Sequence, residues 1–214
     1  MKNVLCCIYI IALTYSCENE PVFENENNPA PINFYALEVG NYWVYKSERY
    51  NSLEEYYFDN GVIDSVSIIG TEDIDGETYF KFRTKTTGND IDSPLSNPNG
   101  VKIEYFRELD GNLINEEGVI KFTNSNYEER LIDEHHWGTI YEILIDGMTT
   151  INVEAGEFDC IYSERYAITP EGEQLEGLDR RYYANGIGLV YDTLSYINNS
   201  TPVIIRSLVS YNVQ

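Results

Sequence analysis

Two short polar clusters are the places where this sequence could do chemistry or hold a metal ion. The first, residues 133–137, contains both histidines of the chain, His135 and His136. Neighbouring residues of an extended chain point to opposite faces, so these histidines are poorly placed to chelate one ion, and an exposed loop is the simpler interpretation. No Gly-x-Ser-x-Gly segment accompanies them, so the sequence offers no nucleophile elbow for a Ser-His-Asp hydrolase.

The second cluster consists of the four carboxylates Glu72, Asp73, Asp75 and Glu77, grouped around Gly76. Hard oxygen ligands in this arrangement could bind Ca²⁺ weakly, although the spacing lacks the closing glutamate of an EF-hand. The alternative is an ordinary tight hairpin turn. Paired carboxylates elsewhere could also serve a glycoside hydrolase, but acidic residues are so abundant here that their presence does not distinguish this function.

Aromatic residues form a third candidate site. Tyr50, Tyr56 and Tyr57 lie close to Glu54 and Glu55, in a chain with 19 tyrosines. Aromatic faces beside carboxylate acceptors are typical of sugar-binding surfaces, so these three tyrosines are candidate ligand contacts. Tyrosine is also a common residue of β-strands, which is the alternative interpretation.

The segments that must position these residues alternate between apolar and polar side chains, with no convincing helical period. Phe80 and Phe82 alternate with Lys81 and Arg83, which is the pattern of a half-buried strand. The same alternation predicts strands at residues 42–50, 62–69, 80–83, 101–105, 150–154, 158–162, 188–197 and 203–211.

Turn residues separate these predicted strands. The pairs Asp75-Gly76, Asp110-Gly111 and Asn185-Gly186 suit the positive φ values of tight hairpins, and residues 87–100 are expected to form a loop. About ten antiparallel strands in one domain cannot stay flat without exposing long edges. We therefore predict an all-β domain whose antiparallel sheet is strongly curved, as a half-barrel or barrel. The sequence of residues 124–138 shows no pattern that predicts a strand or a helix.

The N-terminus has the pattern of an export signal. Lys2 supplies a positive charge, residues 4–13 are largely apolar, and Ser16 precedes Cys17. An apolar run of about ten residues is about half of what a spanning helix needs. Residues 13–17 resemble the lipobox of bacterial lipoproteins, although Thr14 and Tyr15 stand where that motif usually has Leu and a small residue. The resemblance implies cleavage after residue 16 and lipidation of Cys17; an ordinary secretory signal is the alternative.

The segment after the signal is expected to be a tether. Residues 17–33 would form an acylated cysteine followed by a disordered acidic stretch, because Glu, Asn and Pro dominate it and offer little to bury. Acidic residues directly after Cys17 resemble the signal that sends Bacteroidota-type lipoproteins to the outer face of the outer membrane. We therefore expect an outer-membrane location, with the cell surface favoured over the periplasmic face, and a β domain spanning residues 34–214.

One cysteine lies beyond this N-terminal segment. Cys160 has no partner for an intramolecular disulfide if Cys17 is acylated. A period of two places it on the same face as Phe158 and Tyr162, so we expect a small buried hydrophobic residue. Burial raises a thiol pKa, which argues against a catalytic nucleophile.

The charge of the chain excludes one class of partner. The sequence has 36 acidic and 14 basic residues, a formal net charge of −22. Such a chain repels phosphate backbones, so we expect no nucleic-acid partner. A hydrophobic content of 43% is sufficient for one globular core.

Three segments carry a resemblance to a known group of proteins. Residues 39–45 are Val-Gly-Asn-Tyr-Trp-Val-Tyr, residues 153–158 are Val-Glu-Ala-Gly-Glu-Phe, and residues 182–190 are Tyr-Tyr-Ala-Asn-Gly-Ile-Gly-Leu-Val. In this order they resemble uncharacterised secreted lipoproteins of Bacteroidota-type bacteria. The resemblance implies an all-antiparallel, curved β-sheet domain and no reaction.

These observations favour a binding module over an enzyme. We expect a lipid-anchored envelope protein whose β domain binds a small apolar ligand or a glycan, without a cofactor. The alternative is a structural role in which the domain docks with other envelope proteins. A hydrolase with paired carboxylates is the third class.

Overall fold

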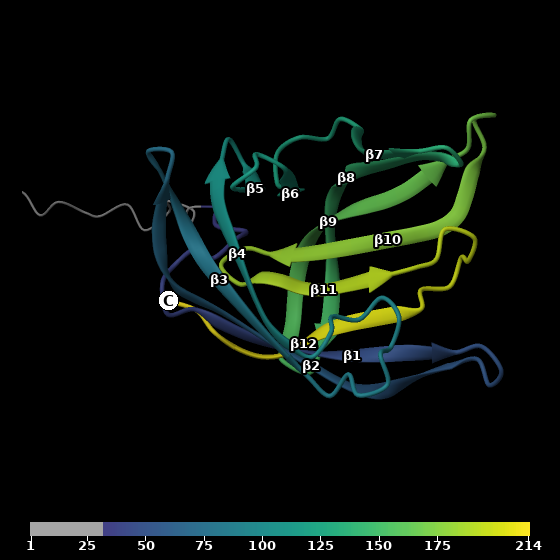
Figure 1. The fold of residues 1–214 in the computed structure, drawn as a ribbon, viewed down its shortest axis with the longest axis horizontal. Coiled ribbons are helices and arrows are strands. Elements are labelled where there is room, and N and C mark those ends of the chain that lie inside the picture. Colours follow the sequence, from purple (N-terminus) through teal and green to yellow (C-terminus); the bar gives the residue numbers. More distant parts are fainter. Residues whose placement is uncertain (1–31) are drawn as a thin grey trace, which may run out of the picture. The chain divides into compact units, whose positions relative to one another are not determined.

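The alternating segments of the sequence form β-strands in the structure, a computed structural model that describes residues 32–214 (Figure 1). The described part contains no helix, and the strands are β1 (Tyr42–Asn51), β2 (Tyr56–Ile74), β3 (Glu77–Thr87), β4 (Gly100–Leu109), β5 (Asn112–Asn115), β6 (Ile120–Thr123), β7 (Arg130–His135), β8 (Gly138–Val153), β9 (Gly156–Ile168), β10 (Gln174–Ala184), β11 (Gly188–Leu194) and β12 (Ile204–Asn212).

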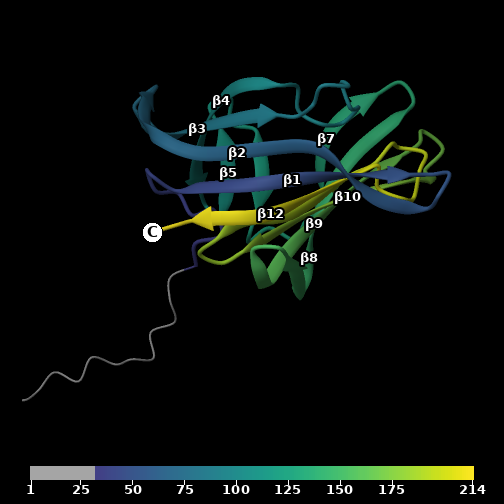
Figure 2. The same cartoon turned by 90° about the horizontal axis from the view of Figure 1, so that it is seen from below.

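All twelve strands belong to one antiparallel sheet, in the order β6-β5-β4-β3-β2-β1-β12-β11-β10-β9-β8-β7. Each half is a meander of six sequential strands. The first and last strands join the two halves, because β1 pairs with β12 from Tyr42 opposite Asn212 to Arg49 opposite Ile204. Figure 2 shows β1 between β2 and β12. The prediction of an all-β, antiparallel domain is confirmed.

Two details of the fold prediction need correction. The sheet has twelve strands rather than about ten, because the short strands β5, β6 and β7 give too few residues for a recognisable alternation. The sheet is also not closed or strongly curled, so the expected curvature is borne out only in part. The edge strands β6 and β7 are connected by a loop and are not paired with each other, which leaves the sheet open.

All three predicted turns are present, but at Asn185-Gly186 only the glycine has a positive φ, of 74°. Asp75 and Gly76 between β2 and β3 have φ values of 53° and 83°, and Asp110 and Gly111 between β4 and β5 have 51° and 76°. Positive φ at both central residues is the geometry that the Asp-Gly pairs suggested. Residues 88–99 form the expected long loop between β3 and β4.

The core brings the two meanders together. Phe122 of β6 is fully buried and stacks on Tyr183 of β10, with ring centroids 4.1 Å apart. Tyr35, which precedes β1, is also buried, and its hydroxyl donates to the carbonyl of Gly111 at 2.6 Å. The sheet therefore bends enough for side chains of its first and second halves to pack against each other.

Candidate ligand-binding pocket

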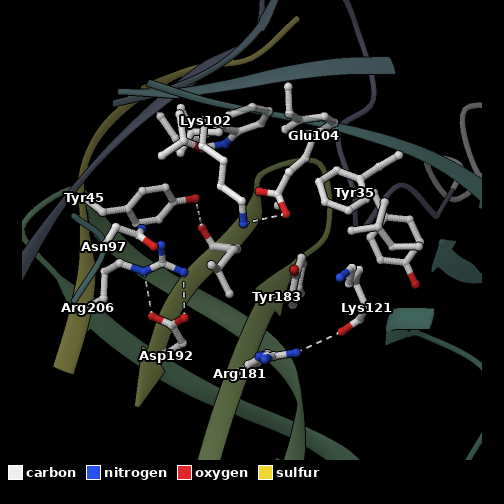
Figure 3. A pocket seen from close by; sticks show the side chains of 18 residues that line it. Tyr35, Tyr45, Asn97, Lys102, Glu104, Lys121, Arg181, Tyr183, Asp192 and Arg206 are labelled. Carbon is white, nitrogen blue, oxygen red and sulfur yellow. Dashed lines mark hydrogen bonds and ion pairs between the residues drawn. The ribbon is translucent and has the colours of Figure 1, made fainter. Parts of the chain in front are cut away.

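A partly open pocket of about 350 Å³ lies where these two meanders face each other (Figure 3). Its lining side chains come from β1 to β6 and from β10 to β12, together with residues that precede or connect these strands. Six of the lining residues are aromatic: Tyr35, Trp43, Tyr45, Phe82, Phe106 and Tyr183. Strands that are distant in the sequence thus contribute to one wall of aromatic rings.

The aromatic wall is held in place by hydrogen bonds and stacking. Trp43 donates its indole N–H to the carbonyl of Ile187 at 2.6 Å, and Tyr45 donates its hydroxyl to Leu189 at 2.8 Å. Trp43 also stacks on Phe82 with an interplanar angle of 8°. Gly188 has a φ of +98°, a conformation that favours glycine, and a Cβ there would meet the Trp43 indole at an ordinary contact distance of 3.5 Å. Trp43 and Tyr45 are only 3% and 4% exposed, because Phe82 stacks on one ring and the Arg206 guanidinium lies over the other. The half-buried rings of the lining, Phe82, Phe106 and Tyr183, are therefore the ones best placed to contact a ligand.

One side of the pocket carries a buried ion-pair network centred on Arg206. Its guanidinium donates to both carboxylate oxygens of Asp192, at 2.9 and 2.7 Å, and lies 3.3 Å from Asp64. Asp64 also accepts from Thr86 at 2.5 Å and from the Asn97 amide at 2.9 Å. Burial alone would lower the pKa of Arg206, but the two carboxylates raise the pKa above its ordinary value. One guanidinium thus faces two carboxylates, and the hydrogen bond from Asn97 to Asp64 fixes the 88–99 loop at the pocket.

The remaining lining charges are mainly basic. Lys102 pairs with Glu104 at 2.9 Å near the rim. On the side opposite Arg206, Arg181 donates to the carbonyl of Lys121 at 3.0 Å and lies 3.6 Å from Glu142 (Figure 3). No ion pair joins Lys121 to a carboxylate among residues 32–214. In all, four basic and two acidic residues line the pocket of this acidic chain.

The buried tyrosines of this region make the stability of the domain dependent on alkaline pH. Burial raises the pKa of Tyr183 to about 12. An unfolded tyrosine ionises near pH 10, so above that pH the unfolded state loses a proton that the folded state keeps, and the free energy of unfolding falls until about pH 12. Urea midpoints measured by circular dichroism should therefore drop between pH 9 and pH 11. Tyr183→Phe should reduce the drop, whereas the exposed Tyr196→Phe should not; equal drops in both variants would contradict this assignment.

The tyrosines proposed from the sequence lie elsewhere. Tyr50 and Tyr57 are cross-strand neighbours in the β1–β2 hairpin, with ring centroids 5.1 Å apart, and Tyr57 donates to the carbonyl of Pro202. Tyr56 is 48% exposed and pairs with the ring of Phe58. The three tyrosines are thus brought together in one hairpin, but none of them lines the pocket. Their role as ligand contacts remains a separate prediction.

The four carboxylates proposed for calcium lie around the β2–β3 turn. The backbone N–H of Gly76 donates to Asp73, while Glu72 pairs with Lys81 at 3.5 Å and Glu77 pairs with Arg107 at 3.4 Å. Within residues 32–214, no group of three or more His, Cys, Asp or Glu side chains is arranged to hold a metal ion. The predicted exposed loop at residues 133–137 is only partly present, because residues 133–135 belong to strand β7 and residues 136–137 form the turn. His135, the last residue of β7, stacks on Trp137.

Cys160 is fully buried in β9, as its alternation with Phe158 and Tyr162 indicated. Burial, with a smaller contribution from Asp159, raises the pKa of its thiol to about 12. We expect iodoacetamide at pH 8 to label Cys160 in the native protein at less than about 1% of the rate in urea, because almost no thiolate is present. Peptide mapping by mass spectrometry measures the labelling of Cys160. Comparable rates in the native protein and in urea would contradict the burial of its thiol.

Cys17 and residues 18–31 of the predicted tether lie outside the described residues. Asn33, the last residue assigned to the tether, is described and donates its backbone N–H to Asn185 at 2.6 Å, so it contacts the β domain. Within the described part, no helix is long and apolar enough to cross a membrane.

The pocket itself could not be located from the sequence. Lys121 and Arg181 are 60 positions apart and meet only through the packing of β6 against β10. The available signal was indirect: the segment containing Trp43 and Tyr45 and the segment containing Tyr183 and Gly188 carried the resemblance noted above, and both line the pocket.

Two solved structures are similar to this one in their overall fold. No protein family and no curated protein matches the sequence. A candidate lipoprotein from Parabacteroides distasonis aligns with 85% of this chain and 99% of its own, at 14% sequence identity and a TM-score of 0.49. A candidate exported protein with a YmcC-like fold from Bacteroides fragilis covers the same shares at 14% identity and a TM-score of 0.48. At these values neither structure carries an argument about the function of this chain.

Proposed function

We propose that this chain is a lipid-anchored envelope protein whose β domain binds a small ligand in the pocket and catalyses no reaction. The supporting observation is the pocket, about 350 Å³ in volume, with six aromatic rings and a few charged groups in its walls. Sites for small molecules are usually cavities of about 300–1,000 Å³ with this mixture of apolar and polar groups. The ligand in this proposal is a small apolar molecule or a glycan. The sheet would curve around it as a half-barrel.

The charged groups of the pocket favour binding over catalysis. Its two carboxylates, Glu104 and Asp192, are each engaged in an ion pair. Glu108 and Asp179 have a pKa raised by burial, but neither lines this pocket. A general acid must lie within reach of the bound substrate, and these two carboxyl groups lie outside the pocket lining.

The proposed binding can be followed by the fluorescence of Trp43. Trp137→Phe removes the second of the two tryptophans, so that the emission reports on the pocket alone. Octyl glucoside, which combines a sugar ring with an alkyl chain, should change this emission with a Kd of about 1 mM, equivalent to about −4 kcal/mol. Thr84→Phe, which fills the pocket from β3, should weaken binding at least about tenfold. Thr78→Phe, an exposed position on the same strand, is the matched control.

No response of Trp43 to octyl glucoside would contradict the binding module and favour the docking role. A response that Thr84→Phe leaves unchanged would place the ligand elsewhere.

The proposed anchor has a separate test. Two or three acyl chains on Cys17 would hold the protein stably at a membrane, whereas one chain gives only marginal binding. Cys17→Ser should move the protein from the membrane fraction to the soluble fraction. Protease treatment of intact cells then tests the proposed exposure at the surface of the outer membrane.

A further inference from the structure

The side chains that line the pocket are more basic than the chain as a whole. The protein carries a net charge of −22, yet four basic and two acidic side chains line this cavity. Both acidic side chains already have a basic partner, since Glu104 pairs with Lys102 and Asp192 with Arg206. Lys121 and Arg181 are the lining cations that remain.

Arg181 shares its counter-ion with two other arginines. Glu142, 1% exposed, lies 2.5 Å from Arg130, 2.8 Å from Arg165 and 3.6 Å from Arg181. Arg181 has the longest of the three contacts. Asp179 lies near Arg165 and Arg181, and these arginines lower its pKa against the larger, raising effect of burial. Two carboxylates therefore face three guanidinium groups, which leaves one positive charge in excess.

Lys121 adds a second uncompensated charge to the same side. Its side chain is half-buried in β6, next to Phe122, and no carboxylate of the described chain lies within 4.0 Å of its ammonium. The Tyr183 hydroxyl makes no hydrogen bond to another described residue. Figure 3 places Lys121, Arg181 and Tyr183 together, opposite the Arg206–Asp192 pair. Burying a charge without a partner is costly, so this corner is better suited to a bound anion than to solvent alone.

We propose that the ligand of this pocket carries a single anionic group, a carboxylate or a phosphate, bound by Lys121, Arg181 and the Tyr183 hydroxyl. This inference rests on the proposed function, because it names the class of ligand for the same site. The ligand body lies against the half-buried rings of Phe82 and Phe106, with Trp43 stacked behind Phe82. The volume of about 350 Å³ admits one small molecule, and the acidic surface of the chain repels polyanions, so the partner is a small anionic glycoside or amphiphile.

The test compares ligands that differ in charge. Octyl glucuronide has a carboxylate where octyl glucoside has a hydroxymethyl group, and octyl phosphate supplies the other anion. In the protein with Trp137→Phe at low salt, at least one of these anionic ligands should bind about tenfold or more tightly than octyl glucoside. Which of the two binds more tightly identifies the anion. The preference should shrink in 0.5 M NaCl because salt screens the attraction.

Lys121→Met is the decisive variant. It removes the charge with little change in side-chain size, so it should abolish most of the preference for the anion by weakening the binding of the anionic ligand far more than that of octyl glucoside. Lys85→Met, at an exposed position of β3 outside the pocket, should leave the preference intact. The melting temperature of each variant confirms that it is folded.

The outcomes separate the two proposals. Equal affinity of the wild-type pocket for all three ligands would overturn the anion proposal and leave the binding module standing. Binding of none of them would overturn the binding module itself. A preference that persists in Lys121→Met would overturn the assignment of the anion to this corner.

Discussion

Replacing Glu142 by Gln should reduce the free energy of unfolding by about 3–5 kcal/mol. Glu142 is the central carboxylate of the arginine cluster, and its side chain is 1% exposed. Gln keeps its size but removes the charge that lies between Arg130, Arg165 and Arg181. Breaking a buried ion pair from one side leaves the other charges buried without compensation, which costs far more than the pair itself contributes. Urea denaturation followed by circular dichroism measures the change.

Glu164→Gln is the matched control for this prediction. Glu164 lies in β9 and pairs with Arg180 at 2.8 Å, but the two side chains are 24% and 39% exposed. Solvent screens such a pair, so its loss should cost at most about 1 kcal/mol. If Glu142→Gln is no more destabilising than Glu164→Gln, the three arginines do not depend on this carboxylate, and the excess positive charge inferred for the cluster is wrong.

The arginine cluster shows why much of the site could not be predicted from the sequence. Its members are cross-strand neighbours: Arg130 lies opposite Glu142 in β7 and β8, and Glu142 lies opposite Arg165 in β8 and β9. A shift of one residue in either register would move these side chains to opposite faces. The alternation along each strand predicts the strand, but it carries no information about which residue of the next strand lies opposite.

The strands themselves were predictable where apolar and polar residues alternate several times in succession. The segments around Trp43, Phe82 and Ile103 alternate regularly and are strands in the structure. Strand β6 contains four residues, Ile120–Thr123, and its side chains are too few to distinguish a strand from a loop. Its place beside β5 follows from tertiary packing, and Lys121 reaches the pocket only because of that placement.

The importance of this short strand leads to the second large effect, for Phe122→Ala. Phe122 is 0% exposed, stacks on Tyr183, and meets the ring of Tyr35 edge to face at 6.4 Å. Truncating a fully buried phenylalanine removes its burial and leaves a cavity, so the free energy of unfolding should fall by about 3–5 kcal/mol. Phe58→Ala, at a side chain 37% exposed in the β1–β2 hairpin, should cost about 1 kcal/mol or less.

The loss should also be local, because Phe122 is the main side chain by which β6 packs on the second meander. With only four residues and one paired neighbour, β6 gains little stability from its own hydrogen bonds. Amide hydrogen exchange in Phe122→Ala should therefore rise first in β5 and β6 and leave β1 and β12 protected. Because Lys121 precedes Phe122, the same variant should weaken any preference of the pocket for anions. Uniform exchange throughout the sheet would instead mean that the two meanders are held together mainly by the β1–β12 pairing, and that Phe122 stabilises the domain without positioning Lys121.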